Sequence, residues 1–153
     1  MEVVFYTENE IFDDDAVCTA CEQITRQAQN EGYLNTMMFA GDFGTFVAFD
    51  DDDDICRYLA VSTWCTPELS SYWAEDETAY IEQVVVSTEA RGQGVASALY
   101  ETLEATGWFF RLMCSVHEGN EVSLAVHEAL GFQVACENED YLVLIKYLPS
   151  KIC

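Results

Sequence analysis

The stretch from Val84 to Ala96 joins a β-rich run to a helical pattern through a turn that contains two glycines. Tyr80–Val86 supplies the β-rich run, Glu89–Gly94 the turn, and Val95–Thr106 the pattern that predicts a helix. Glycines let backbone N–H groups approach an anion closely, and a helix N-terminus adds unsatisfied donors and a positive dipole. The segment therefore predicts either a pyrophosphate-binding turn or an ordinary strand-to-helix connection. Its spacing matches neither the phosphate loop of NTPases nor the dinucleotide-binding fingerprint.

The rest of the chain is predicted to alternate strands with helices. Strands are expected at Val3–Tyr6, Thr45–Phe49, Ile55–Thr63, Trp108–Val116, Phe132–Cys136 and Tyr141–Leu148, and helices from Asp13–Asp15 to Gly32 and at Asn120–Leu130. Trp64–Thr78 is expected to be a connecting loop, and no second-domain boundary is visible. This order predicts an α/β sheet with helices on its faces.

The chain is strongly acidic, and its charge excludes several functions. Its 153 residues contain 28 Asp and Glu against 6 Lys and Arg, which gives a formal net charge of -22. Half of the residues (50%) are hydrophobic, enough for a core, so an acidic disordered tail is excluded. Scarce cations argue against nucleic-acid binding. We recognise no basic leader and no apolar run of membrane-spanning length, and therefore expect a cytoplasmic protein without a membrane partner.

Two residue clusters suggest metal or redox chemistry, and both have simpler interpretations. Cys18-x-x-Cys21 lies in a predicted helix, and no second Cys-x-x-Cys or spaced His pair completes a zinc site. We expect these cysteines to pack as small hydrophobes in a reducing compartment. The acidic run Asp50–Asp54 lacks the spacing and terminal Glu of a calcium loop, so we expect a solvated turn and no bound metal.

Two motifs in the second half of the chain resemble those of the GNAT N-acetyltransferase superfamily. The first is Arg91-Gly92-Gln93-Gly94-Val95-Ala96, and the second is Asn120-x-x-Ser123-x-x-x-His127-x-x-x-Gly131-Phe132. Their order and spacing also match that family, and the resemblance covers about Tyr80–Leu148. It implies one α/β domain over residues 1–153, with a mixed, mostly antiparallel central sheet of six to seven strands flanked by helices.

The resemblance also implies acetyl-CoA as co-substrate and assigns residues to it. The backbone amides of Arg91, Gly92, Gln93, Gly94, Val95 and Ala96 would hold the pyrophosphate, and the strand at Val84, Val85 and Val86 would pair with the pantetheine arm. Asn120 and Ser123 would line the same groove, although Asn120 is equally suited to cap the helix that follows it.

Glu82 and His127 are the candidate catalytic residues. An amine must lose a proton before it attacks a thioester, and Glu82 stands just before the cofactor-pairing strand, where it resembles the catalytic Glu of polyamine acetyltransferases. In a regular strand Glu82 shares a face with Val84 and Val86. His127 occupies a position where many relatives have the Tyr that reprotonates the leaving thiolate. Three interpretations of His127 remain open: general acid, groove-lining contact, or packing.

The acidic charge favours a cationic acceptor, with a polyamine or diamine as the first choice. Acidic residues in the loop that precedes Glu82 would attract ammonium groups, namely Glu68, Glu75, Asp76 and Glu77. Two other functions remain open: acetylation of a protein lysine or N-terminus, and a non-catalytic acyl-CoA-binding module with a regulatory role. The oligomeric state is also open, and a homodimer is one alternative.

Overall fold

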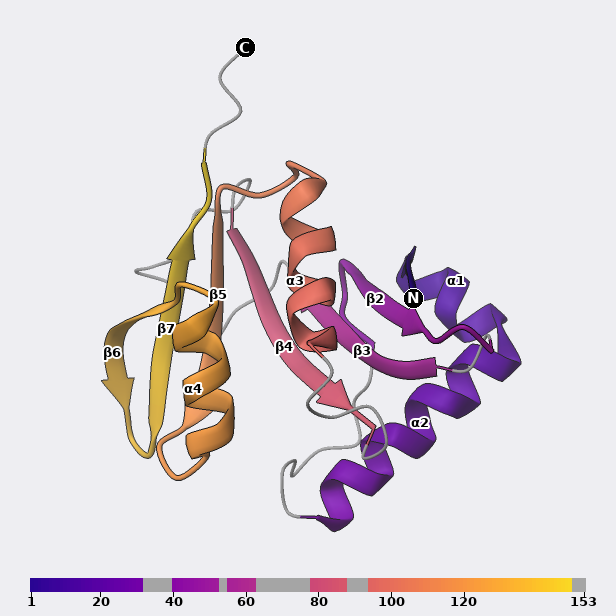
Figure 1. Cartoon of the computed structure of the whole chain (residues 1–153), viewed down its shortest axis with the longest axis horizontal. Coiled ribbons are helices and arrows are strands. Elements are labelled where there is room, and N and C mark those ends of the chain that lie inside the picture. Colours follow the sequence, from indigo (N-terminus) through magenta and orange to yellow (C-terminus); the bar gives the residue numbers. More distant parts are fainter. Residues whose placement is uncertain (32–39, 53–54, 63–77, 88–93, 150–153) are drawn as a thin grey trace.

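The described residues form one seven-stranded sheet with four helices (Figure 1). The computed structural model describes residues 1–31, 40–52, 55–62, 78–87 and 94–149. The strands are β1 (Glu2–Tyr6), β2 (Gly44–Phe49), β3 (Ile55–Ser62), β4 (Thr78–Val86), β5 (Arg111–His117), β6 (Gln133–Asn138) and β7 (Tyr141–Tyr147). The helices are α1 (Glu8–Asp13), α2 (Asp15–Asn30), α3 (Val95–Ala105) and α4 (Glu121–Ala129).

The sheet has the order β1-β2-β3-β4-β5-β7-β6, and β4–β5 is the parallel pair among the described strands. The other five pairings are antiparallel. The prediction of a mixed, mostly antiparallel sheet of six to seven strands flanked by helices is therefore confirmed. No helix in the described ranges is both long and apolar enough to cross a membrane.

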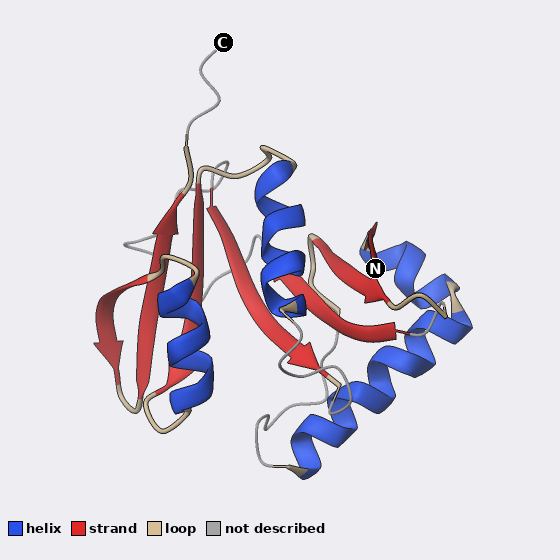
Figure 2. Cartoon of the chain, viewed as in Figure 1, coloured by secondary structure: helices blue, strands red, loops and turns tan. Residues whose placement is uncertain are grey.

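Alternating side chains along the sheet build two apolar layers on its opposite faces. On β2, Phe46 and Ala48 belong to a cluster with α3, whereas Val47 between them belongs to a cluster with α2. Leu124 and Leu130, from α4 and its end, pack against the α3 cluster, so α3 and α4 cover the same face. Figure 2 shows these helices against the strands. Successive side chains of a strand point to opposite faces of the sheet, so each face has its own apolar layer on which its helices pack.

The main differences from the prediction are one additional helix and the starts of two strands. Helix α1 was not predicted; Thr7 and Glu10 form a capping box at its start, and Ile11 is fully buried. Strand β5 begins at Arg111 rather than at Trp108. Trp108 precedes the strand, and its side chain is 48% exposed. Strand β4 begins at Thr78, which was predicted as the end of a loop.

Several expectations fall on residues that the structure does not describe. The helix stop at Gly32, the loop over residues 64–77 and part of the aspartate run lie there. Of the Cys-x-x-Cys pair, Cys21 is fully buried in the α2 cluster, which confirms packing for that residue, and burial raises the pKa of its thiol to about 12. Cys18 is half-buried, and neither thiol is in a disulfide.

A bulge in β4 interrupts the regular alternation of its side chains. Gln83 pairs with Ala60 of β3 and Ile81 pairs with Val61, so Glu82 is the extra residue between them. As a result Ile81 packs in the α3 cluster, while Gln83 bonds to Tyr58 in the α2 cluster. The expectation that Glu82 shares a face with Val84 assumed a regular strand. The bulge at Glu82 interrupts that strand.

Candidate functional site

Strands β4 and β5 separate toward their carboxyl ends, and the candidate residues of β4 lie beyond the point where they separate. Their pairing runs from Thr78 with Arg111 to Ile81 with Cys114. Beyond this point β4 continues to Val86 and β5 to His117, and the two strands diverge (Figure 1). Because they are parallel, both lead at the same edge of the sheet into the helices α3 and α4. Ligands of open α/β sheets bind at such carboxyl edges.

Polar groups that the sequence analysis did not single out lie at this separation. The hydroxyl of Tyr80 on β4 donates to Oγ of Ser115 on β5 at 3.3 Å, one residue from the last paired residues. His117 at the end of β5 is exposed, and its Nδ1 accepts a hydrogen bond from the backbone N–H of Gly119 at 3.0 Å. These contacts depend on the β4–β5 register, which spacing in the sequence does not reveal.

The bulge residue Glu82 is half-buried, and its Oε2 atom is inaccessible to solvent. The next residue, Gln83, is 6% exposed and anchors the bulge to the α2 face, because its Oε1 accepts from the Tyr58 hydroxyl at 2.9 Å. Tyr58 also bonds to the hydroxyl of Thr25 on α2. The candidate base is therefore attached to a buried polar network that joins α2, β3 and β4.

Two of the three valines of β4 that were expected to pair with the pantetheine arm take part in the two apolar layers of the sheet. Val84 packs against the α3 cluster and Val85 is buried in the α2 cluster. Val86 is half-buried. Their side chains are thus used for packing, and backbone groups of this part of β4 lie where β5 no longer pairs with it.

The N-terminus of α3 differs from those of the other three described helices. Thr7, Asp14 and Asn120 cap α1, α2 and α4 with side-chain oxygens, and each of these helices has an acidic residue in its first turn. Helix α3 begins at Val95 with Gly94 as its N-cap, so no side chain caps it, and its first turn contains no acidic residue. Gly94 has a φ of 71°, a conformation that favours glycine. The first N–H groups of α3 are therefore suited to an anion.

The remaining turn residues Arg91, Gly92 and Gln93 lie outside the described residues. Val95 is 5% exposed and packs in the α3 cluster, and Ala96 is half-buried. The first turn of α3 is thus anchored by one apolar side chain, and its backbone donors face the edge where β4 ends.

Asn120, Ser123 and His127 form one connected row on α4, as their spacing predicts. The Asn120 side-chain oxygen accepts from the Ser123 N–H at 3.2 Å, so Asn120 is the helix cap and its amide group keeps two donors. Nδ1 of His127 lies 2.7 Å from the Ser123 carbonyl oxygen and 3.3 Å from its Oγ.

The His127 ring lies inside the molecule, 5% exposed, with Phe132 at its edge. Its Nε2 lies 2.8 Å from the hydroxyl of Tyr100 on α3, which is 1% exposed. Burial lowers the pKa of His127, and the Ser123 carbonyl opposes this in part. Burial likewise raises the pKa of Tyr100 well above its ordinary value. Both groups are therefore neutral near pH 7.

The described Lys and Arg side chains bond to other groups of the protein. Arg26 pairs with Glu22 on the exposed side of α2, and Lys146 of β7 pairs with Glu104 of α3. Arg111 donates from Nε to the Thr78 hydroxyl at 2.8 Å, at the opposite, amino-terminal ends of β4 and β5. Among residues with described side chains, backbone donors rather than cations are the positive groups at the edge. No group of three or more His, Cys, Asp or Glu in the described residues could hold a metal ion.

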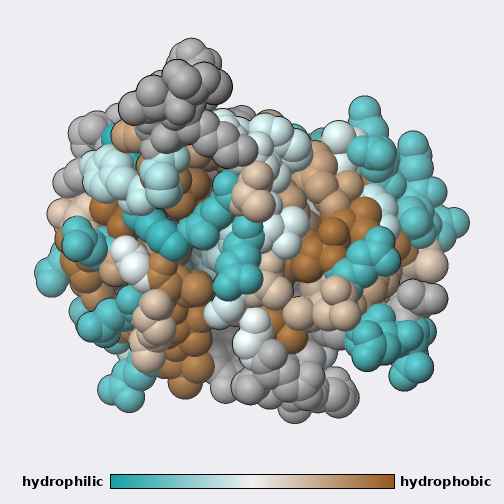
Figure 3. Space-filling view, turned by 45° about the horizontal axis from the view of Figure 1, so that its top comes forward, coloured by the Kyte–Doolittle hydropathy of each residue, from teal (hydrophilic) through white to brown (hydrophobic). Residues whose placement is uncertain are grey.

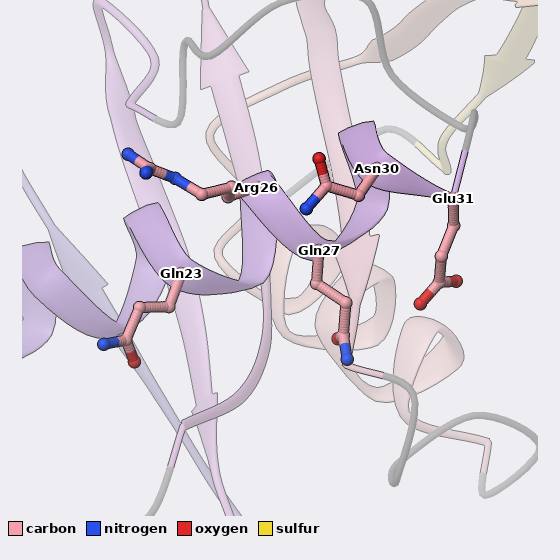
Figure 4. Close-up of a pocket in the computed structure, with 5 residues that line it drawn as sticks. All are labelled: Gln23, Arg26, Gln27, Asn30 and Glu31. Carbon is pink, nitrogen blue, oxygen red and sulfur yellow. The ribbon is translucent and has the colours of Figure 1, made fainter.

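A surface pocket of about 360 Å³ runs along the second half of α2. It is lined by Gln23, Arg26, Gln27, Asn30 and Glu31. Figure 4 shows these side chains spread along the helix rather than converging on one point. Ligand sites have a few convergent polar groups in an apolar setting, so this pocket does not compete with the β4–β5 edge.

Comparison with known proteins identifies the family of the chain and several solved structures with a similar fold. The Acetyltransferase (GNAT) family matches residues 9–132, and no curated protein matches the chain. Among solved structures, an aminoglycoside 6'-N-acetyltransferase complexed with coenzyme A aligns with a TM-score of 0.71 at 11% identity, covering 100% of both chains. The protein yncA from Salmonella typhimurium, with its cofactor acetyl-CoA, aligns with a TM-score of 0.69 at 14% identity over 100% of this chain and 98% of that one. A chain of the NatC complex bound to Gag peptide and CoA aligns with a TM-score of 0.63 at 16% identity over 97% and 100%.

Proposed function

Because the chain belongs to the acetyltransferase (GNAT) family, we propose that it transfers the acetyl group of acetyl-CoA to a primary amine of a cationic small molecule, such as a diamine or polyamine. The amine would attack the thioester directly in a ternary complex. The observation that carries this proposal is the edge where β4 leaves β5 beside the uncapped N-terminus of α3. All three similar structures described above, the aminoglycoside acetyltransferase, yncA and the NatC complex, contain CoA or acetyl-CoA.

The proposed acetyl-CoA site uses backbone donors for most of its contacts. Amides of the turn at Arg91–Gln93 and of Gly94, Val95 and Ala96 would bind the pyrophosphate, helped by the α3 dipole. The backbone of Val84–Val86 would pair with the pantetheine arm. Asn120 keeps two amide donors while it caps α4, so capping and binding are compatible, and Ser123 lies beside it on α4. The absence of acids from the first turn of α3, in a chain with 28 of them, fits an anionic ligand.

Glu82 is the proposed general base. An alkylammonium is mostly protonated at neutral pH, and a carboxylate can accept its proton directly or through water. Glu82 is the extra residue of the β4 bulge, and bulges aim side chains at active sites. A backbone amide of the strand that follows would polarise the thioester carbonyl.

The acidic charge supports the choice of acceptor. A net charge of -22 attracts cations over several ångströms and repels anionic acceptors. Acidic residues in the segment that precedes β4 (Glu68, Glu75, Asp76 and Glu77) would add to this attraction.

The test is an acceptor screen with acetyl-CoA in which release of the CoA thiol is measured. Diamines, polyamines, aminoglycosides, amino acids and peptides with a free lysine or N-terminus are compared side by side. We expect the highest kcat/KM with a polyamine or diamine. A preference for peptides would instead indicate a protein acetyltransferase. No thiol release with any amine would contradict the proposal that the chain is an N-acetyltransferase.

The variant Glu82→Gln tests the base in the same assay. We expect kcat to fall about 100-fold or more, because a general base typically contributes this much, while CoA binding is unchanged. Glu101→Gln, which removes the same charge from an exposed position of α3, is the matched control and should leave kcat unchanged. A Glu82→Gln protein that binds CoA and keeps the wild-type kcat would show that Glu82 is not the base. A wild-type protein that binds CoA but releases no thiol with any amine would favour the non-catalytic acyl-CoA-binding module.

A further inference from the structure

A buried cluster of three rings joins α3 to α4 behind the proposed acetyl-CoA site. It consists of Tyr100 on α3, His127 on α4, and Phe132 just beyond α4. The ring centroids lie 5.6 Å apart for Tyr100 and His127, 5.5 Å for Tyr100 and Phe132, and 5.1 Å for His127 and Phe132, each in an edge-to-face arrangement. None of the three is more than 5% exposed. The cluster therefore packs as part of the core.

The hydrogen bonds of His127 fix which of its nitrogens carries the proton. The carbonyl oxygen of Ser123 can only accept, so Nδ1 at 2.7 Å from it must be the protonated nitrogen. Nε2 of the neutral ring is then an acceptor, and the Tyr100 hydroxyl donates to it at 2.8 Å. Both nitrogens are thus used inside the protein, and neither has a proton free for a ligand.

Protonation of His127 would break this arrangement. A second N–H on Nε2 would face the Tyr100 hydroxyl, which would have to turn its own hydrogen toward another acceptor. The titratable groups that act on Tyr100 are Cys114 of β5, which is 4% exposed, and Glu104 of α3, which is engaged by Lys146 of β7. Neither is a hydrogen-bond partner of Tyr100 in the described part of the structure. The neutral pair is therefore the stable form.

The position of this pair relates it to the site. Tyr100 lies six residues after Gly94 on α3, and His127 lies seven after Asn120 on α4, which is about 9 to 10 Å of helix in each case. The bond between them fixes the spacing of two helices whose N-termini lie at the carboxyl ends of β4 and β5. Those N-termini carry the backbone donors of α3 and the cap residue Asn120.

We propose that Tyr100 and His127 are positioning residues, whose hydrogen bond holds the α3 and α4 N-termini at the spacing that binds acetyl-CoA. This role differs from the proton donation that the family resemblance suggested for His127. The positioning role rests on one part of the proposed function, namely that CoA binds at these two helix N-termini. It does not depend on which amine is the acceptor.

The first test is spectroscopic and needs no activity. In ¹⁵N NMR of the free protein at pH 7.5, we expect the His127 ring to be protonated on Nδ1 and unprotonated on Nε2. The chain has two histidines, so the His127→Gln spectrum assigns the signals. Protonation on Nε2, or a ring that titrates like an exposed histidine, would overturn the proposal.

The second test separates CoA binding from catalysis. Tyr100→Phe removes one hydroxyl and leaves Nε2 without its donor, so we expect the CoA dissociation constant to rise about fivefold or more by calorimetry. The KM for acetyl-CoA should rise in parallel, while kcat at saturation and the shape of its pH profile stay unchanged. Thr102→Val removes a hydroxyl that, among the described residues, bonds within α3 to the Ala98 carbonyl, and it should leave the dissociation constant unchanged.

His127→Gln decides between positioning and proton donation. Its side-chain oxygen can replace Nε2 as acceptor for Tyr100, so we expect near-normal kcat. A fall of about 100-fold in kcat with unchanged CoA affinity would instead identify His127 as the general acid. Affinity is measured with CoA alone, so a wild-type protein that binds CoA but acetylates no amine would contradict the proposed function and leave this test intact. A Tyr100→Phe protein that folds and binds CoA like the wild type overturns the positioning role.

Discussion

His127 is a titratable residue that burial holds in its neutral form, and this couples the stability of the fold to pH. Its pKa in the folded state is lowered from the ordinary value of about 6.5 that applies to the unfolded chain. Between the two pKa values the unfolded state binds more protons than the folded state. The free energy of unfolding is therefore fully retained above pH 6.5 and falls as the pH drops below it.

We expect the wild-type protein to lose more stability than His127→Gln between pH 7.5 and 5.5. The free energy of unfolding from urea titrations at several pH values measures the difference. His117→Gln, which removes the exposed histidine in place of the buried one, is the matched control. Equal slopes for wild type and His127→Gln would show that the buried imidazole is not the titrating group. Carboxylates titrate mainly near pH 4 and contribute to all three proteins alike.

Single residues of the site differ in how far the sequence alone predicts them. Gly94 was predicted from its place between a strand and a helix, and its φ of 71° explains why glycine stands there. Spacing placed Asn120, Ser123 and His127 on one helical row, and the structure connects them. The burial of His127 was not predictable, because it depends on Tyr100 of another helix, 27 residues away.

At the scale of elements, helix α3 combines a typical helix body with an unusual beginning. The chain places acids in the first turns of α1, α2 and α4, where the dipole favours them, and omits them from α3. Such an omission gives up a small amount of helix stability. It is explained if another anion binds there.

The variant Ser97→Glu tests this explanation by adding an acid to the first turn of α3. We expect an unchanged or slightly higher melting temperature, because an acid near a helix N-terminus stabilises by about 0.3–1 kcal/mol. CoA affinity should fall about fivefold or more, since the new charge repels the phosphates by ~1 kcal/mol. Ser97→Gln, the neutral variant of the same size, should change neither quantity much. If Ser97→Glu binds CoA as the wild type does, the phosphates lie elsewhere.

Element order was predictable from the sequence, whereas the details that shape the site were not. Period-two and helical patterns located most strands and helices, because burial on one face imposes those periods. For α1, the Thr7-x-x-Glu10 spacing of a capping box is a signal that is visible in the sequence. The bulge at Glu82 and the Tyr80–Ser115 contact arise from pairing between strands, and a single strand's sequence does not contain its register.

At the scale of the whole molecule, the chain combines a net charge of -22 with an ordinary share of hydrophobic residues, 50%. Hydrophobic residues also reach the surface, and Figure 3 shows them among hydrophilic ones on the displayed face. Trp108, Phe110, Val122, Val134 and Tyr147 are examples of exposed apolar residues. With -22 charges on 153 residues, electrostatic repulsion between copies of the chain opposes self-association at low salt.

The same charge sets opposite salt dependences for the two proposed substrates. CoA is anionic, and the described cations Arg26, Arg111 and Lys146 bond to other groups of the protein, so long-range repulsion opposes its binding. Raising the ionic strength from about 0.01 M to about 0.15 M shortens the screening length from about 30 Å to about 8 Å. Short-range bonds to backbone amides are little affected, so we expect CoA affinity by calorimetry to increase with salt. The KM of a polyamine acceptor should rise over the same range, because screening removes the attraction. A CoA affinity that falls with salt would mean that a cation, with Arg91 as the first candidate, dominates the field at the site.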